Sequence, residues 1–137
     1  MSDLFPLSRN AFLVPGRARM DLYADPPGTR MEEARCFAAD PGGSAANIAA
    51  ALARQGTRAA LLTRLSDDAV GRFGQAELDR SGMDRADVCL IGGERRASLA
   101  VVETRAQDSQ SVNDRNGAAD VALAEGDASS FAPPQRR

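Results

Sequence analysis

The stretch "PGGSAANIAAALARQG", residues 41–56, decides the fold, because two glycines stand directly before a helix-forming run. Ser44 is placed to cap this helix, alanines fill it, and Gly56 stands where helices close. A helix N-terminus presents unpaired N–H groups, and glycines before it let a ligand approach the backbone. The stretch therefore predicts a helix over 44–56 with a candidate ligand site at its mouth.

The residues around this mouth indicate which ligand it could take. Asn47, in the first turn, offers both a hydrogen-bond donor and an acceptor, which suits a hydroxylated ligand better than a phosphate. No Lys-Ser or Lys-Thr follows the glycines, so this is not a Walker A loop, and the spacing is not G-x-G-x-x-G either. A tight turn that only packs against the helix stays open as the alternative.

The flanking sequence predicts an α/β fold with a parallel sheet. Short apolar runs predict strands at 11–16, 58–66 and 87–91, and 67–82 reads as a second helix that Gly71 and Gly74 weaken. Strands that alternate with helices indicate parallel pairing through crossover helices. Other predictions are a loop at 25–30, an ambiguous segment at 32–40 that weakly favours a strand, a hairpin at 97–115, and a disordered tail at 124–137.

Composition excludes several classes of protein. The 137 residues contain 17 Lys plus Arg and 19 Asp plus Glu, and a net charge of −2 offers no basic field for nucleic acid. No run approaches the roughly 20 apolar residues that span a bilayer, and the N-terminus does not resemble a secretory signal. We therefore expect a cytoplasmic protein, in which Cys36 and Cys89 are reduced, buried thiols.

Two further features bear on chemistry. Histidine is absent, which excludes Ser-His-Asp and Cys-His catalysis and every His-ligated metal site. Asp21 follows the first predicted strand in "VPGRARMD", and ligands of open parallel sheets bind beyond the carboxyl ends of the strands. A carboxylate there could accept hydrogen bonds from a polyol, although a solvated loop acid is the plainer alternative.

The segment "GGSAANIAAALARQGTRAALLTRLSDDAVGRFG" resembles the first signature of the ribokinase-like (PfkB) carbohydrate kinases, in their N-terminal half. The matching positions are Gly42, Gly43, Asn47, Gly56 and Gly71. The segments "GRARMDLYADPPGTRMEEARCF", "SLAVVETRAQDSQSV" and "RNGAAD" resemble a branch that phosphorylates 5-dehydro-2-deoxygluconate in inositol catabolism. The likeness covers about residues 11–123.

The resemblance implies a sheet flanked by helices, with a small β-lid whose strands lie at about 32–40 and 97–115. It implies transfer of the γ-phosphoryl group of ATP, with Mg²⁺, to a hydroxyl of a sugar acid, and a homodimer formed through the lid. The substrate contacts that it implies are Asp21, Gly42, Gly43, Asn47 and Arg115, with Arg115 facing the carboxylate of the substrate.

The sequence also departs from the family pattern. The family's catalytic Asp belongs to a Gly-Ala-Gly-Asp motif that does not occur here, and "AEGDASSFA" with Asp127 is not that motif. We therefore expect a truncated or frame-shifted product that is inactive alone and binds ATP weakly. Arg19 stands where the branch has glycine, and Asn113-Asp114 replace an apolar and an aromatic residue.

Three alternatives for the function stay open. The chain could be a sugar-binding module without catalysis, a vestigial fragment, or part of another PfkB kinase that acts on 2-keto-3-deoxygluconate or fructose. If the residues that normally cover them are missing, a sheet edge and apolar faces should be exposed.

Overall fold

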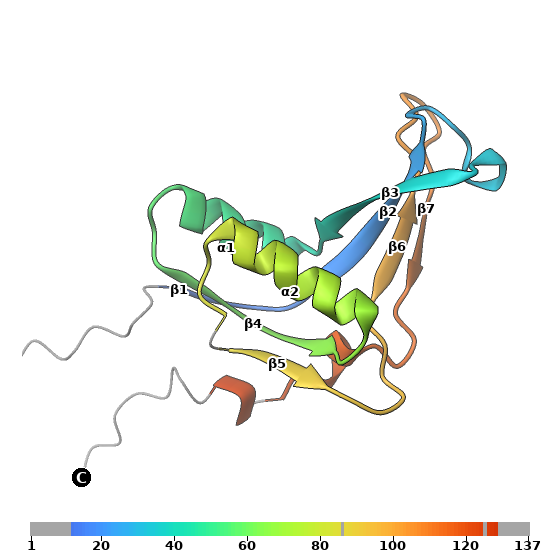
Figure 1. The fold of residues 1–137 in the computed structure, drawn as a ribbon. Coiled ribbons are helices and arrows are strands. Elements are labelled where there is room, and N and C mark those ends of the chain that lie inside the picture. The colour runs from blue at the N-terminus through green and yellow to red at the C-terminus, as the bar shows by residue number, and fades with distance from the viewer. Residues whose placement is uncertain (1–11, 86, 125, 129–137) are drawn as a thin grey trace, which may run out of the picture.

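A computed structural model describes residues 12–85, 87–124 and 126–128. One of its two sheets is parallel, with the strand order β1-β4-β5. Helix α1 directly precedes β4 in the chain, and α2 connects β4 to β5; the two helices pack against each other on one face of the sheet (Figure 1). The bounds are β1 Phe12–Pro15, α1 Ser44–Arg54, β4 Ala59–Ser66, α2 Ala69–Ser81 and β5 Val88–Ile91. The predicted α/β class is confirmed.

The central strand β4 carries the core. Its sequence "AALLTRLS" is buried at every position except Arg64, as expected for a parallel strand covered on both faces. Leu61 and Leu65 pack against small residues of α1, which let the helix lie close to the sheet; these are Ala45, Ala46 and Ala49. The outer strands expose apolar side chains, among them Phe12 on β1 and Leu90 on β5, as the sequence led us to expect.

The ends of α1 follow one sequence prediction and contradict another. The N-cap is Gly43 and no side chain caps the helix, so the predicted capping role of Ser44 is wrong; Ser44 is itself the first helical residue. Gly56 has a φ of 80° and donates to the carbonyl of Ala53, while Thr57 donates to the carbonyl of Leu52. This closure confirms the predicted role of Gly56.

Helix α2 starts later than predicted because Asp68 caps it. Asp68 Oδ1 accepts hydrogen bonds from the N–H groups of Gly71, at 2.9 Å, and Val70, at 3.0 Å. These bonds, that of Gly71 first, hold the pKa of Asp68 below its ordinary value. Gly71 does more than weaken the helix: a Cβ there would lie 1.7 Å from the Ser66 carbonyl oxygen, so glycine lets α2 approach the end of β4.

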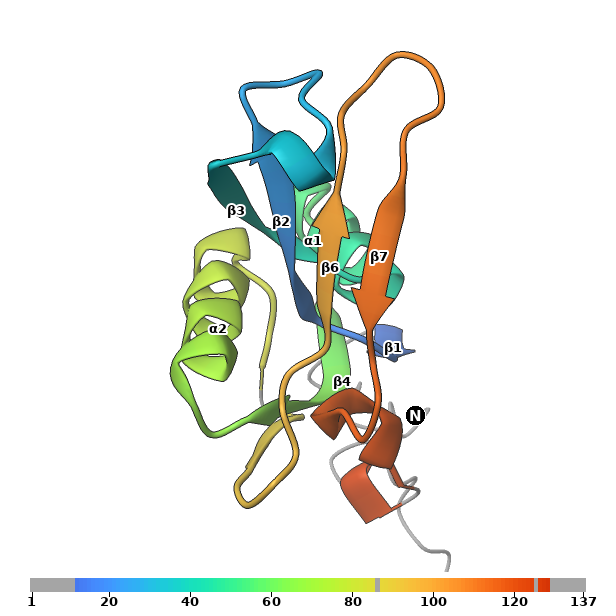
Figure 2. The same ribbon diagram turned by 90° about the vertical axis from the view of Figure 1, so that its right-hand side faces the viewer.

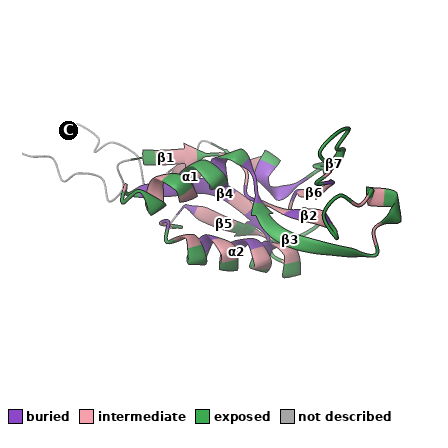
Figure 3. Ribbon diagram, turned by 90° about the horizontal axis from the view of Figure 1, so that it is seen from above, coloured by how far each residue is buried: buried purple, intermediate pink, exposed green. Residues whose placement is uncertain are grey.

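The second sheet forms a lid that rises from the parallel sheet (Figure 2). Its strand order is β3-β2-β6-β7; β2 pairs in parallel with β6, and the other two pairings are antiparallel. The predicted hairpin at 97–115 is present as β6 and β7. Figure 3 shows that the outer strand β3 is exposed along most of its length. The bounds are β2 Arg19–Asp25, β3 Cys36–Gly42, β6 Leu99–Val102 and β7 Ser111–Asp114.

Some local predictions need correction. The strand expected at 32–40 begins only at Cys36, because a 3₁₀ turn, η1, occupies Met31–Glu33. Strand β2 was not predicted, so Asp21 lies inside a strand and not in a loop. The predicted burial of both cysteines is also wrong: they are free thiols, but Cys36 is exposed and Cys89 is half-buried.

The end of the described chain packs against β4. The turn η2, Ala119–Ala122, lies on the side of β4 away from α2 (Figure 2). Asp127 makes two 2.8 Å contacts with the guanidinium of Arg64. Residues 125 and 129–137 of the predicted disordered tail lie outside the described residues, so that prediction stays a prediction. No helix within the described ranges is long and apolar enough to cross a membrane.

Candidate functional site

Gly43 meets a close backbone approach at the mouth of α1. Its φ is 100°, and a Cβ there would lie 2.4 Å from the carbonyl oxygen of Arg17. That carbonyl also accepts a 3.2 Å hydrogen bond from the N–H of Ala46, which ties the chain after β1 to the first turn of the helix. Gly43 is therefore required by the packing of the chain itself, which supports part of the tight-turn alternative.

Gly42 makes room for a side chain. A Cβ at this position would lie 2.3 Å from the carboxyl carbon and from both carboxyl oxygens of Asp21. Asp21 is only 6% exposed, at the middle of β2, and Asp40 of β3 is its cross-strand partner. The solvated loop acid considered above is therefore excluded: the structure brings Asp21 and Gly42 together beside the helix mouth, as the sequence predicted.

Arg19 lies over the carboxylate of Asp21. Its Nε is 2.6 Å from Asp21 Oδ1, and its Nη2 is 3.5 Å from Oδ2. Its Nη1 donates to Asn113 Oδ1 at 2.5 Å. Nε and Oδ1 are buried and in ion-pair contact, but they are not aligned as a hydrogen bond. Two of the three positions that depart from the expected pattern, Arg19 and Asn113, therefore meet at the candidate site.

The polar side chains that β2 contributes to the candidate site lie on one face of this strand. Side chains alternate along a strand, so Arg19, Asp21 and Tyr23 point to the same face. The pKa of Tyr23 is raised, first by burial and then by the negative charges of Asp21 and Asp40. Sequence reasoning did not place Tyr23, Asp40 or Asn113 in the site. The polar residues that alternate at 19, 21 and 23 could have pointed to Tyr23. This pattern is informative only once β2 is identified as a strand.

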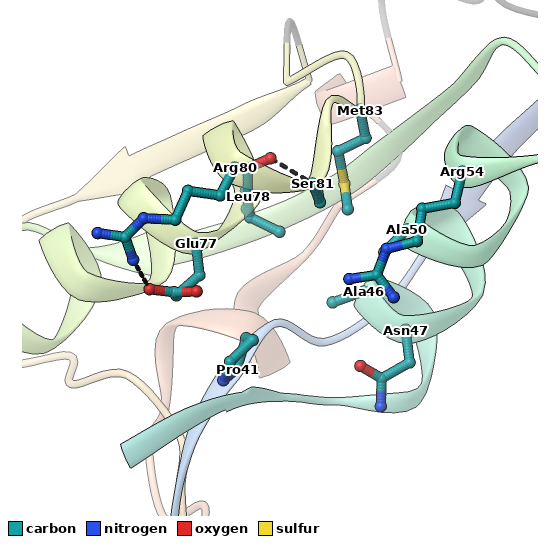
Figure 4. A pocket seen from close by; sticks show the side chains of 10 residues that line it. All are labelled: Pro41, Ala46, Asn47, Ala50, Arg54, Glu77, Leu78, Arg80, Ser81 and Met83. Atoms are coloured by element: carbon teal, nitrogen blue, oxygen red, sulfur yellow. Dashed lines mark hydrogen bonds and ion pairs between the residues drawn. The ribbon is translucent and has the colours of Figure 1, made fainter. Parts of the chain in front are cut away.

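Asn47 lies elsewhere. Its exposed side chain lines a pocket of about 230 Å³ between α1 and α2 (Figure 4). This pocket is lined by Pro41, Ala46, Asn47, Ala50, Arg54, Glu77, Leu78, Arg80, Ser81 and Met83. It includes neither Asp21 nor the two glycines, so the structure does not bring the Asn47 amide to the Asp21 carboxylate. The sugar-binding role of Asn47 stays a prediction.

Arg115 stands directly after β7 with an exposed side chain. Its guanidinium makes no hydrogen bond or ion pair with any residue that the structure describes. The next two residues, Asn116 and Gly117, line an open groove of about 660 Å³ with Arg64 and Arg95. The groove lies by the carboxyl ends of β4 and β5, where ligands of such sheets bind. Within the described part of the chain, Arg115 is thus a cation without a side-chain partner, next in sequence to residues of this groove.

The model of the pfkB family carbohydrate kinases matches residues 11–133. The chain belongs to this family. As a PfkB protein it carries the Gly42-Gly43 pair and Asp21 together, as the resemblance led us to expect, and its two sheets correspond to the parallel sheet and lid expected from the same resemblance.

Curated relatives of this PfkB chain act on more than one sugar by name. A 5-dehydro-2-deoxygluconokinase of Photobacterium profundum is 32% identical over 111 residues, which cover 81% of this chain and 34% of that enzyme. Fructokinase-1 of Oryza sativa is 38% identical over 109 residues, covering 79% and 33%. The chain therefore spans about a third of the length of the curated relatives that it matches.

Solved structures agree on the fold. The crystal structure of a PfkB protein from Polaromonas sp. JS666 has a TM-score of 0.79 and 26% identity, and covers 86% of this chain and 40% of that one. A 2-dehydro-3-deoxygluconokinase from Thermotoga maritima has a TM-score of 0.77 and 25% identity, and covers 85% and 35%.

Proposed function

We propose that this PfkB chain forms the sugar-binding part of a cytoplasmic kinase that phosphorylates 5-dehydro-2-deoxygluconate in inositol catabolism. The observation that carries the proposal is the Asp21 carboxylate, held over Gly42 at the mouth of α1. An ionised carboxylate accepts strong hydrogen bonds from sugar hydroxyls. The guanidinium of Arg115, which has no partner among the described residues, is one candidate partner for the substrate carboxylate, and the guanidinium of Arg19 is another.

The choice of an acidic sugar has two supports. The guanidinium of Arg19 lies against the Asp21 carboxylate at the candidate site, and a sugar acid needs such a cation as a partner. Several curated relatives at 32–34% identity are named 5-dehydro-2-deoxygluconokinase. Fructokinase names among the relatives keep a neutral sugar as the second candidate, and 2-keto-3-deoxygluconate as a third.

ATP with Mg²⁺ would supply the phosphoryl group and neutralise its charge, while the residues described here would bind and orient the sugar. We assign no residue of this chain to ATP or Mg²⁺. Asp127 does not fit the role of catalytic base, because Arg64 and the N–H of Ala124 hold its carboxylate and keep its pKa below the ordinary value. We therefore expect the 137 residues alone to bind sugar acid without turnover.

The lid also supports a proposal about assembly. Strand β3 is exposed along all of its length except Gly42, and both lid edges carry large apolar side chains, Phe37 and Val112. Exposed strand edges pair readily with another chain. We therefore propose a homodimer formed through the lid. Sedimentation velocity should show a dimer, and a monomer at high micromolar concentration would contradict it.

Titration calorimetry of the 137-residue chain tests the proposed substrate. We expect 5-dehydro-2-deoxygluconate to bind more tightly than fructose and 2-keto-3-deoxygluconate. Asp21→Asn should weaken this binding about tenfold, the cost of one hydrogen bond to a charged group. Asp25→Asn is the matched control, because Asp25 is exposed at the end of the same strand. Tighter binding of fructose would favour the second candidate.

Two further readouts separate the remaining alternatives. A cooperative thermal unfolding transition is expected, whereas a vestigial fragment without a native fold would show none. An assay of ADP release with the sugar acid and MgATP should show no turnover by the chain alone. Turnover would place a catalytic base within the 137 residues and overturn this part of the proposal.

A further inference from the structure

The carboxylate that would bind the sugar is already paired within the chain. Asp21 contacts Arg19 through both oxygens, and the Asp21 and Arg19 side chains are only 8% and 20% exposed. The Nη1 atom of the same guanidinium donates a hydrogen bond to Asn113 on β7, two strands away from β2 in the lid. A sugar hydroxyl that is to reach Asp21 must therefore displace or rearrange this ion pair.

We propose that Arg19 is a specificity-determining residue, which admits acidic sugars to Asp21 and disfavours neutral ones. This inference rests on the sugar site of the proposed function. A sugar acid can replace both partners of the pair: its hydroxyls bind Asp21, and its carboxylate binds the guanidinium of Arg19. A neutral sugar can take the place of Arg19 as the partner of Asp21, but it has no carboxylate for Arg19. The guanidinium is then left without an anion.

The physical basis is the asymmetry of buried ion pairs. Separating such a pair is costly when one charge is left without a partner, and much less costly when both charges are paired again. The low exposure of both side chains places them where this asymmetry operates. Binding of a neutral sugar therefore loses the free energy of the Arg19–Asp21 ion pair, whereas binding of an acidic sugar largely restores it. The selectivity follows from the chain's own contacts.

Asp40 strengthens the argument. It lies directly opposite Asp21 in the β2–β3 pairing, so two carboxylates face each other across the strands. Like charges in this position repel each other and would also repel an acidic ligand. The guanidinium of Arg19 contacts Asp21 of this acidic pair, and without it the negative charge would favour neutral sugars.

Arg19→Ala in the 137-residue chain is the first test, with fructose and 5-dehydro-2-deoxygluconate titrated by calorimetry. We expect the affinity for fructose to rise about tenfold, because Asp21 becomes free to accept a charged hydrogen bond. The affinity for the sugar acid should fall, so the preference for the acid over fructose decreases or reverses. Arg35→Ala is the matched control, since Arg35 is exposed just before β3.

Arg19→Ala leaves Asp21 buried without its cation, so its fold must be checked by circular dichroism. Asn113→Ala provides a second, milder test. It removes only the anchor of Nη1 and keeps the ion pair, and Asn113 is itself exposed. We expect a rise of about two- to threefold in fructose affinity, because the hydrogen bond that holds the guanidinium in place is lost.

The outcomes distinguish this inference from the proposed function. If wild type binds no sugar acid but Arg19→Ala gains affinity for fructose, the proposed substrate is wrong, and of the role of Arg19 only the exclusion of neutral sugars stands. If the folded variants gain no affinity for fructose, or if the ratio of the two affinities does not change, the role of Arg19 is overturned. This second result leaves the proposed substrate intact wherever wild type prefers the sugar acid.

Discussion

The parallel sheet and the lid are stabilised by different means. In the parallel sheet, the apolar strand β4 is covered by α1 and α2, and its leucines are almost fully buried. The lid has no comparable core: β3 and β7 are exposed almost throughout, and polar contacts connect its parts. This chain therefore has its apolar core in one sheet and its candidate ligand site at the base of the other.

Glu103 is the main polar contact at the far end of the lid. Its buried carboxylate accepts hydrogen bonds from the N–H of Met31, at 2.9 Å, and of Gln110, at 3.2 Å, and it pairs with Arg105 at 3.3 Å. It therefore joins the loop after β2 to the loop between β6 and β7. A single charged group therefore holds this end of the lid together, whereas several buried leucines hold the parallel sheet together.

The largest effect is expected from Gly71→Ala, where α2 meets the end of β4. The added Cβ would lie 1.7 Å from a backbone oxygen that cannot move aside, so we expect a loss of about 4 kcal/mol in the free energy of unfolding. Gly74→Ala is the control, because its Cβ makes only ordinary contacts with Leu65 and should stabilise the helix by up to about 1 kcal/mol. Urea unfolding measures both, and equal effects would contradict the close approach.

A second pair of variants compares the two sheets directly. Leu61→Ala removes a fully buried side chain of β4 and should cost about 3 kcal/mol. Val112→Ala, on the lid strand β7, removes a side chain that is 56% exposed and should cost less than about 0.5 kcal/mol. Similar losses in urea unfolding would show that the lid has a core of its own.

Protonation of Glu103 should loosen the lid alone. Its pKa lies below 4.5, its ordinary value, chiefly because of the hydrogen bond from Met31. The stability it contributes is therefore present above the pKa of the unfolded chain and is lost as pH falls through the lower folded value. Hydrogen exchange should show the protection of the Met31 and Gln110 amides falling at acid pH. Glu103→Gln should abolish this pH step, and Glu94→Gln, an exposed control, should keep it.

A modest change in stability is expected for Gly42→Ala. The three atoms nearest to the added Cβ all belong to the carboxyl group of Asp21, which can rotate away, so the cost should stay within about 1 kcal/mol. The displaced carboxylate should nevertheless weaken binding of the sugar acid about tenfold. Gly126→Ala, whose Cβ meets nothing within 4 Å, is the control. Unchanged affinity in Gly42→Ala would remove Asp21 from the site.

The same contrast explains what could be predicted from the sequence. Continuous apolar runs and helix closures by glycine announced β4, α1 and α2, because burial on both sides leaves a clear pattern. Strand β2 was missed because "RMDLYAD" mixes polar residues with half-buried ones, and its pairing with β6 depends on residues far along the chain. The sequence pointed to Asp21 and Gly42, but the contacts of Arg19 with Asp21 and with Asn113 depend on side-chain geometry that no motif records.

The bond between Arg19 and Asn113 joins positions 94 residues apart. Substitutions at these two positions are therefore epistatic: the effect of changing either residue depends on which residue occupies the other. A double-mutant cycle of Arg19→Ala and Asn113→Ala should give a coupling of about 0.5 kcal/mol or more, whereas unconnected sites would be additive. If Arg19 is replaced with glycine, the residue expected from the related branch, Asn113 loses its hydrogen-bond donor. The two positions are therefore best exchanged together.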